Sequence, residues 1–211
     1  MPIAKQSGGN FEPVPAGTHI ARCIACIALG TQPQNNSQYA PSFKIMVTWE
    51  LPNEAIEIEG VSKPMVVSKE YTNSLSEKAN LYADLTSWRG REFTAKELEG
   101  FEVSNVVGVA CMITVVHKTT AKKTVYANVA SVSGLPKGSQ CAPAVHSLVK
   151  YEITQGKDAV YAALPEWIQK KIAQCFEWTK PAQNEDRFQH SADPESEYEP
   201  GENSEQVDVP F

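Results

Sequence analysis

The sequence predicts a mainly β protein, built as one small five-stranded barrel with accessory helices. Several short segments are rich in β-branched and aromatic residues and alternate between apolar and polar side chains, as half-buried strands do. One segment with helical spacing lies between the third and the fourth of them. Clusters of Gly, Pro, Asn and Ser separate the segments, and such clusters are typical of turns and loops. These three observations support the predicted fold class.

The first three strands are expected at about 18–29, 42–51 and 65–72. A long loop rich in Gln, Asn and Ser follows the first strand. Pro52 is expected to end the second strand, because proline cannot donate a hydrogen bond to a neighbouring strand. The alternate positions of the second strand that share one face are apolar: Phe43, Ile45, Val47 and Trp49.

A helix is expected after the third strand. Ser74 and Glu77 have the spacing of a capping box, in which each side chain satisfies a backbone N–H at a helix start. Gly90 suits the left-handed residue that ends many helices. The apolar residues between these ends have the spacing of one helical face: Leu81, Tyr82, Leu85 and Trp88.

A second capping box, formed by Thr94 and Glu97, predicts a short helix that ends at Gly100. Two segments with high β-branched content follow at about 106–117 and 124–132. Because a short polar loop joins these segments, they are expected to form a hairpin.

The end of the folded part is harder to assign. Residues 137–163 have no clear pattern. Pro165 suits the first turn of a helix, and an apolar stripe predicts that this helix covers about 165–178 and packs on the body. Residues 181–211 have few large apolar side chains, so burial cannot offset the entropy cost of ordering them. We therefore expect a folded domain over 1–180 and a disordered acidic tail over 181–211.

The predicted order is three strands, a helix and two strands. This is the order of the OB-fold, a five-stranded and partly open barrel that binds oligonucleotides on its second and third strands and on the flanking loops. A five-stranded β-sandwich is the competing interpretation, and the helix in the middle of the chain disfavours it.

The charge is unevenly distributed along the chain. Residues 182–211 contain nine acidic residues and one basic residue, so the formal charge of −6 combines a tail of −8 with a body of +2. The acidic pI therefore describes the tail and leaves nucleic acid open as a partner of the body. Neither a secretory leader nor a membrane-spanning segment is evident, which predicts a soluble, cytoplasmic protein.

No enzymatic, metal or cofactor site is expected. Cys23 and Cys26 form a C-x-x-C, but residues three apart on a regular strand point to opposite faces, so their sulfurs would diverge. The histidines are scattered and match no metal or nucleophile motif. A metal-dependent nuclease without a recognisable motif, a strand-annealing recombination protein and an adaptor protein remain as alternatives to a binding protein.

Binding of a single strand requires cations along the phosphates and aromatic faces on which bases stack. The second and third predicted strands, the ends of the first helix and the loop between the last two strands supply both. Trp49 has a competing interpretation as a core residue, because its face of the strand is apolar. The candidate DNA-binding residues are Lys44, Trp49, Lys63, Lys69, Tyr71, Arg89, Arg91, Lys118, Lys122 and Lys123.

The last four residues are Asp208, Val209, Pro210 and Phe211. With this ending, the chain resembles bacterial and phage single-stranded DNA-binding proteins, whose acidic tails end in Asp-Ile-Pro-Phe or close variants. The resemblance implies that Phe211 enters an apolar pocket of replication and repair enzymes, where a basic residue binds its carboxylate. The tail departs from many bacterial members because it has no dense run of aspartates before this ending.

The body resembles phage-encoded members of the same class in several short segments: 17–22, 30–32, 88–91 and 126–132. The resemblance implies a role in phage DNA replication, recombination or repair inside a bacterial host. It implies single-stranded DNA and replication proteins as partners. The oligomeric state stays open, and a homo-oligomer is one possibility.

Overall fold

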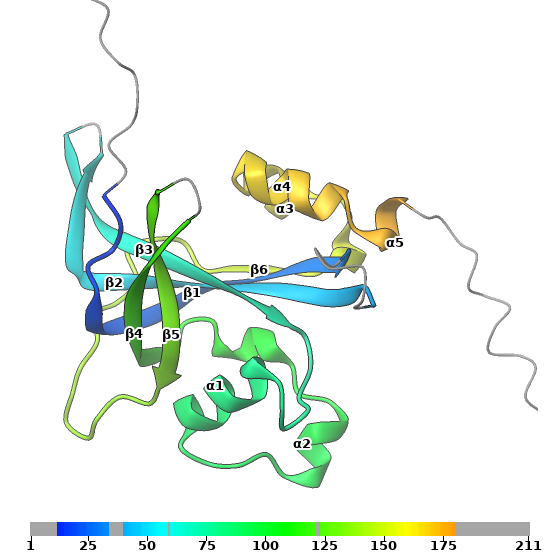
Figure 1. Ribbon diagram of the computed structural model, residues 1–211, viewed down its shortest axis with the longest axis horizontal. Coiled ribbons are helices and arrows are strands. Elements are labelled where there is room, and N and C mark those ends of the chain that lie inside the picture. Colours follow the sequence, from blue (N-terminus) through cyan, green and yellow to red (C-terminus); the bar gives the residue numbers. More distant parts are fainter. Residues whose placement is uncertain (1–11, 34–39, 59, 121–122, 180–211) are drawn as a thin grey trace, which may run out of the picture. The chain divides into compact units, whose positions relative to one another are not determined.

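The computed structural model describes residues 12–33, 40–58, 60–120 and 123–179, all within one unit of the chain. Five antiparallel strands form a sheet in the order β3-β2-β1-β4-β5, which curls into a half-barrel (Figure 1). This mainly β architecture confirms the predicted class and is consistent with an OB-like fold. The strands are β1 Gly17–Gln32, β2 Ser42–Ile58, β3 Val61–Thr72, β4 Ala110–Thr119 and β5 Val125–Ser133.

The long strand β1 belongs to both halves of the sheet. Its first part, Gly17–Arg22, pairs with β4, and its later part pairs with β2. Register shifts interrupt the pairing with β2 between Cys23 and Ala25 and between Ala28 and Gly30. Such bulges bend a strand and increase its twist, which lets one strand curve between the two halves.

The first bulge overturns the expectation that Cys23 and Cys26 point to opposite faces. One extra residue breaks the alternation, so both cysteines lie in the same buried cluster. Burial raises the pKa of both thiols, that of Cys26 to about 12, and they are therefore neutral at physiological pH.

The prediction that Pro52 ends the second strand is wrong, since β2 continues to Ile58. The pairing with β3 shifts between Leu51 and Ala55, and Pro52 lies within this irregularity, where the missing N–H is tolerated. The result is a long β2–β3 hairpin whose turn contains Gly60 at a φ of 77°.

The first helix, α1, covers Asn80–Arg89 and starts after Ala79, which makes no capping side-chain bond. The predicted capping box is therefore wrong. The Ser74 hydroxyl instead accepts a hydrogen bond from the backbone N–H of Ser76 at 3.2 Å and stabilises a turn before the helix. The predicted end is confirmed, because Gly90 has a φ of 67° and donates its N–H to Thr86.

The second helix, α2, covers Ala95–Glu99, and its capping box between Thr94 and Glu97 is present as predicted. A 3₁₀ turn, η1, follows at Val103–Val106 and leads into β4. α1 and η1 pack against the inner side of the half-barrel and close its main core, whereas α2 itself buries no residue.

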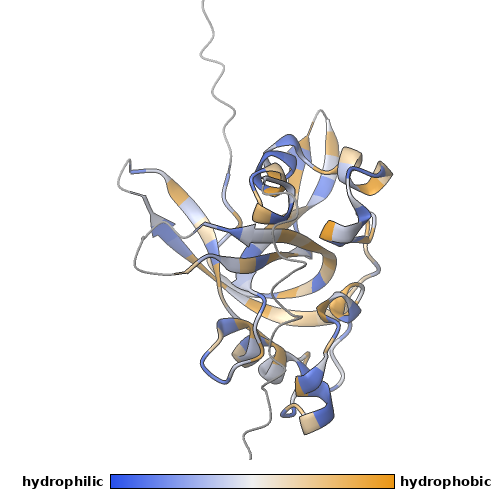
Figure 2. Ribbon diagram, turned by 90° about the vertical axis from the view of Figure 1, so that its right-hand side faces the viewer, coloured by the Kyte–Doolittle hydropathy of each residue, from blue (hydrophilic) through white to orange (hydrophobic). Residues whose placement is uncertain are grey.

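The other face of β1 and β2 is covered by the C-terminal part of the body (Figure 1). A short strand, which the sequence did not predict, pairs in parallel with β1, and the helix expected over 165–178 is divided in two. Residues 23–29 of β1 are all apolar and buried, because this part of the strand contributes side chains to both cores; Figure 2 colours the strands by hydropathy. These C-terminal elements are β6 Val149–Tyr151, η2 Ile153–Gln155, α3 Ala159–Ala163, α4 Glu166–Ala173 and α5 Phe176–Thr179.

Candidate nucleic-acid interface

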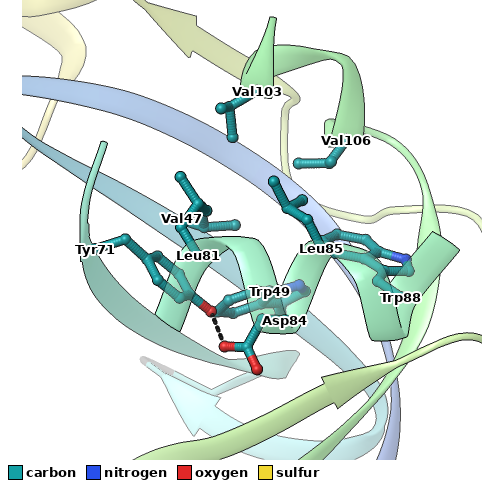
Figure 3. A pocket seen from close by; sticks show the side chains of 9 residues that line it. All are labelled: Val47, Trp49, Tyr71, Leu81, Asp84, Leu85, Trp88, Val103 and Val106. Atoms are coloured by element: carbon teal, nitrogen blue, oxygen red, sulfur yellow. Dashed lines mark hydrogen bonds between the residues drawn. The ribbon is translucent and has the colours of Figure 1, made fainter. Parts of the chain in front are cut away.

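The two aromatic residues predicted to stack on bases lie in the main core. Trp49 is 1% exposed and Tyr71 is 4% exposed. Figure 3 shows both rings beside α1, where Trp49 lies near Trp88 and the Tyr71 hydroxyl points at Asp84. Burial, together with the Asp84 carboxylate, raises the pKa of Tyr71. Neither ring has a face available to a base in this structure, which argues against the stacking role predicted for both.

Lys69 lies on the same inner side as Tyr71. Its Nζ is 2.7 Å from the Asp84 carboxylate and 5.0 Å from the centre of the Tyr71 ring. The side chain of Lys69 therefore joins β3 to α1 and points away from the outer surface of the sheet.

Arg89 and Arg91 both bind Glu97 of α2. Arg91 makes two hydrogen bonds to the Glu97 carboxylate, at 2.7 and 2.9 Å, and Arg89 makes one. Hydrogen bonds from Arg91 and Thr94 hold the pKa of Glu97 far below its usual range. The Arg89 guanidinium also stacks on the Phe93 ring at 4.2 Å. In this arrangement, the two arginines mainly fasten α1 to α2.

The remaining candidates on β2 and β3 lie on an acidic hairpin. Lys44 donates a hydrogen bond to the Thr72 hydroxyl at 2.8 Å, and Lys63 is exposed opposite Ile56. Residues 42–72 contain five glutamates and three lysines. This hairpin is therefore net negative, which disfavours a phosphate backbone.

A strap of residues 141–146 lies across the outer side of β1 and β2. Glu50 is 0% exposed and accepts hydrogen bonds from the backbone N–H of Val145 at 3.0 Å and of His146 at 2.8 Å. It also contacts Nδ1 of His146 at 2.6 Å. Burial by itself would raise the pKa of Glu50, but these hydrogen bonds outweigh it and hold the pKa below its usual value.

Arg22, the register partner of Glu50, holds the other end of the strap. Its guanidinium donates to the carbonyl oxygens of Ala142 at 2.9 Å, Cys141 at 2.8 Å and Gly108 at 2.6 Å. Two adjacent charged side chains therefore clamp the main chain of one segment. The strap covers the outer face of the sheet at Arg22 and Glu50, and the C-terminal elements cover it at Ala25, Ile27, Leu29 and Met46.

The β4–β5 hairpin has a different surface. Lys118 and Tyr126 are directly opposite each other, so their side chains share one face of the hairpin. Both are exposed, and Tyr126 is 41% exposed. Lys123 is exposed beside the loop and has a φ of 63°, whereas Lys122 lies outside the described residues. An aromatic ring beside a cation is the combination that single strands use.

Tyr126 was missed by the sequence prediction, which looked for aromatic residues on the second and third strands. The distribution of charged residues along the sequence could have identified the β4–β5 hairpin as a candidate binding surface. Between Glu102 and Glu152 the chain contains five lysines and neither aspartate nor glutamate. This acid-free stretch includes the whole of β4 and β5.

Some of the predicted features fall on residues that the structure does not describe. The predicted partner-binding residues Asp208, Val209, Pro210 and Phe211 lie outside the described residues, as does the predicted disordered tail. In the described ranges, no group of three or more His, Cys, Asp and Glu residues could hold a metal ion. None of the helices in the described part of the chain could span a membrane.

No family model and no curated protein sequence matches this chain.

Proposed function

We propose that this protein binds single-stranded DNA without sequence preference and protects it during phage DNA replication, recombination or repair. The observation that carries the proposal is the β4–β5 hairpin, which presents an exposed Tyr126 beside Lys118 on an acid-free stretch. Bases of any identity have a face that can stack on an aromatic ring, and lysines attract the phosphates between them.

The curled five-stranded sheet supports the same proposal. Its strand order and the position of α1 between β3 and β4 are consistent with an OB-like fold, and OB-folds commonly bind oligonucleotides. This support is at the level of the fold alone, because one fold serves many functions. The exposed residues of the hairpin therefore carry more weight than the architecture.

The proposal predicts a preference for single strands over duplexes. Fluorescence anisotropy with oligo-dT, mixed-sequence and duplex oligonucleotides should give tight and similar binding to the two single strands and weaker binding to the duplex. The logarithm of affinity should fall with the logarithm of salt concentration, with a slope of about −0.7 per phosphate contacted. Equal or tighter binding to the duplex would contradict the proposal.

The C-terminal residues extend the proposal to a second partner. The ending Asp208-Val209-Pro210-Phe211 combines an aromatic side chain with a free carboxylate, which suits an apolar pocket with a basic residue at its edge. We propose that this ending recruits replication and repair proteins of the host.

Deletion of Phe211 should abolish the capture of these proteins and leave the affinity for DNA unchanged, because only the aromatic anchor and the position of the carboxylate are lost. Affinity capture from a host lysate, followed by mass spectrometry, makes the comparison. Deletion of Gln206 is the matched control, since it shortens the tail equally and keeps the ending. Identical partners for all three proteins would show that the ending recruits nothing.

A further inference from the structure

The outer surface of the half-barrel is divided into a covered part and an open part. On the covered part, the strap hides Glu50, and the C-terminal helices bury Ala25, Ile27, Leu29 and Met46. The second and third strands are where an OB-fold usually holds its ligand. Here the β2 half of that face is largely occupied by the protein itself.

The open part is formed by the outer residues of β5, β4 and the start of β1, residues 17–21. Residues that pair across antiparallel strands share a face, so the register gives the composition of this surface. Starting from the tip of the hairpin, the successive rows are Lys118 with Tyr126, Val116 with Asn128, Thr18 with Thr114 and Ser131, and Ile20 with Met112 and Ser133.

The chemistry of these rows matches a single strand. The row at the tip joins a cation to an exposed ring, and the next rows offer amide and hydroxyl groups beside aliphatic side chains. No carboxylate occurs in the sequences of β4 and β5, whereas the β2–β3 hairpin carries five glutamates. The net charges of the two hairpins therefore favour binding of a polyanion on β4 and β5 over binding on β2 and β3.

From these observations we propose that single-stranded DNA crosses the outer face of β5, β4 and the start of β1, with Tyr126 as its stacking platform. This inference rests on the proposed function and specifies where it occurs. From Lys118 to Met112 the path covers seven residues of β4, and these six steps measure about 20 Å at about 3.3 Å per step.

The test measures the affinity for a fluorescein-labelled oligo-dT by anisotropy at several salt concentrations. Tyr126→Ala should raise Kd by between about fivefold and about 150-fold, because one stacked base is lost. Tyr126→Phe should bind nearly as well as the unmodified protein, because it keeps the ring. Lys118→Ala should flatten the salt slope by about 0.7. Crosslinking to bromodeoxyuridine-substituted DNA, followed by peptide mapping, should label the peptide that contains Tyr126.

Two matched controls test whether the location of a lysine or of an aromatic ring matters, because each removes the same type of residue at another exposed site. Lys63→Ala removes an exposed lysine from the acidic hairpin, and Trp167→Ala removes a ring that is 55% exposed on α4. Neither should change the affinity. Circular dichroism should show that all variants remain folded, since each substitution is at the surface.

The outcomes distinguish the inference from the proposed function. If the unmodified protein does not bind oligo-dT, the proposed function fails and the inference fails with it. If it binds, but Tyr126→Ala and Lys118→Ala bind equally well, the proposed function stands and this path is wrong. Weakened binding by Lys63→Ala alone would place the strand on β2 and β3 instead.

Discussion

Replacement of Trp49 by alanine is expected to lower the free energy of unfolding by about 3–5 kcal/mol. Trp49 is among the largest fully buried side chains, and its ring centre is 6.2 Å from that of Trp88. Its removal would leave a cavity between β2 and α1 that the packed surroundings cannot fill. Urea denaturation followed by circular dichroism measures the change.

Trp167→Ala is the control for this prediction, because the exposed ring should contribute no more than about 0.5 kcal/mol. DNA affinity must be measured under conditions in which both variants are folded. If Trp49→Ala kept its stability but lost its affinity for single strands, Trp49 would be a stacking residue, and its placement in the core would be contradicted.

Substitution of Glu50 by glutamine should cost about 2–4 kcal/mol at neutral pH, since hydrogen bonds to a buried charged acceptor are worth more than neutral ones. The variant keeps the size of the side chain but turns an amide NH₂ toward groups that themselves donate. Chemical denaturation measures the global effect. Hydrogen exchange at the backbone amides of Val145 and His146 should accelerate if the strap is released.

The difference between the unmodified protein and Glu50→Gln should depend on pH. The pKa of Glu50 is lowered in the folded state, so its contribution is fully present above the pKa of an unfolded glutamate, about 4.3, and is lost as the pH falls through the folded-state value. The two proteins should therefore converge in stability in acid. Glu57→Gln, at an exposed site of the same strand, should change little at either pH. A constant difference down to pH 2 would contradict the role of the ionised carboxylate.

The sequence was most informative where structure depends on neighbours along the chain. The alternation from Phe43 to Trp49 predicted β2, and the pair Thr94 and Glu97 predicted the start of α2. Pro52 lies in a bulge, and the sequence pattern does not distinguish a bulge from the end of a strand. Ser74 lies in a turn, and the pattern does not distinguish such a turn from the start of a helix.

Contacts between distant segments could not be predicted in this way. The three-residue strand β6 is too short to show alternation, and Glu50 meets its partners 95 and 96 positions away. For the same reason, the sequence assigned Trp49 and Tyr71 to the right strands but could not decide which side of the sheet was inside. Tyr126 could have been found, since the absence of acidic residues around it is visible in the sequence.

The clamp formed by Arg22 and Glu50 has a consequence for how the strap can evolve. Apart from Nδ1 of His146, every strap group that is hydrogen-bonded to these two side chains belongs to the main chain. Most side chains at 141–145 can therefore change without loosening the attachment. Proline at Val145 or His146 is the exception, because it would remove the N–H that Glu50 binds. The surface above β1 and β2 can thus diversify in sequence while its backbone keeps one path.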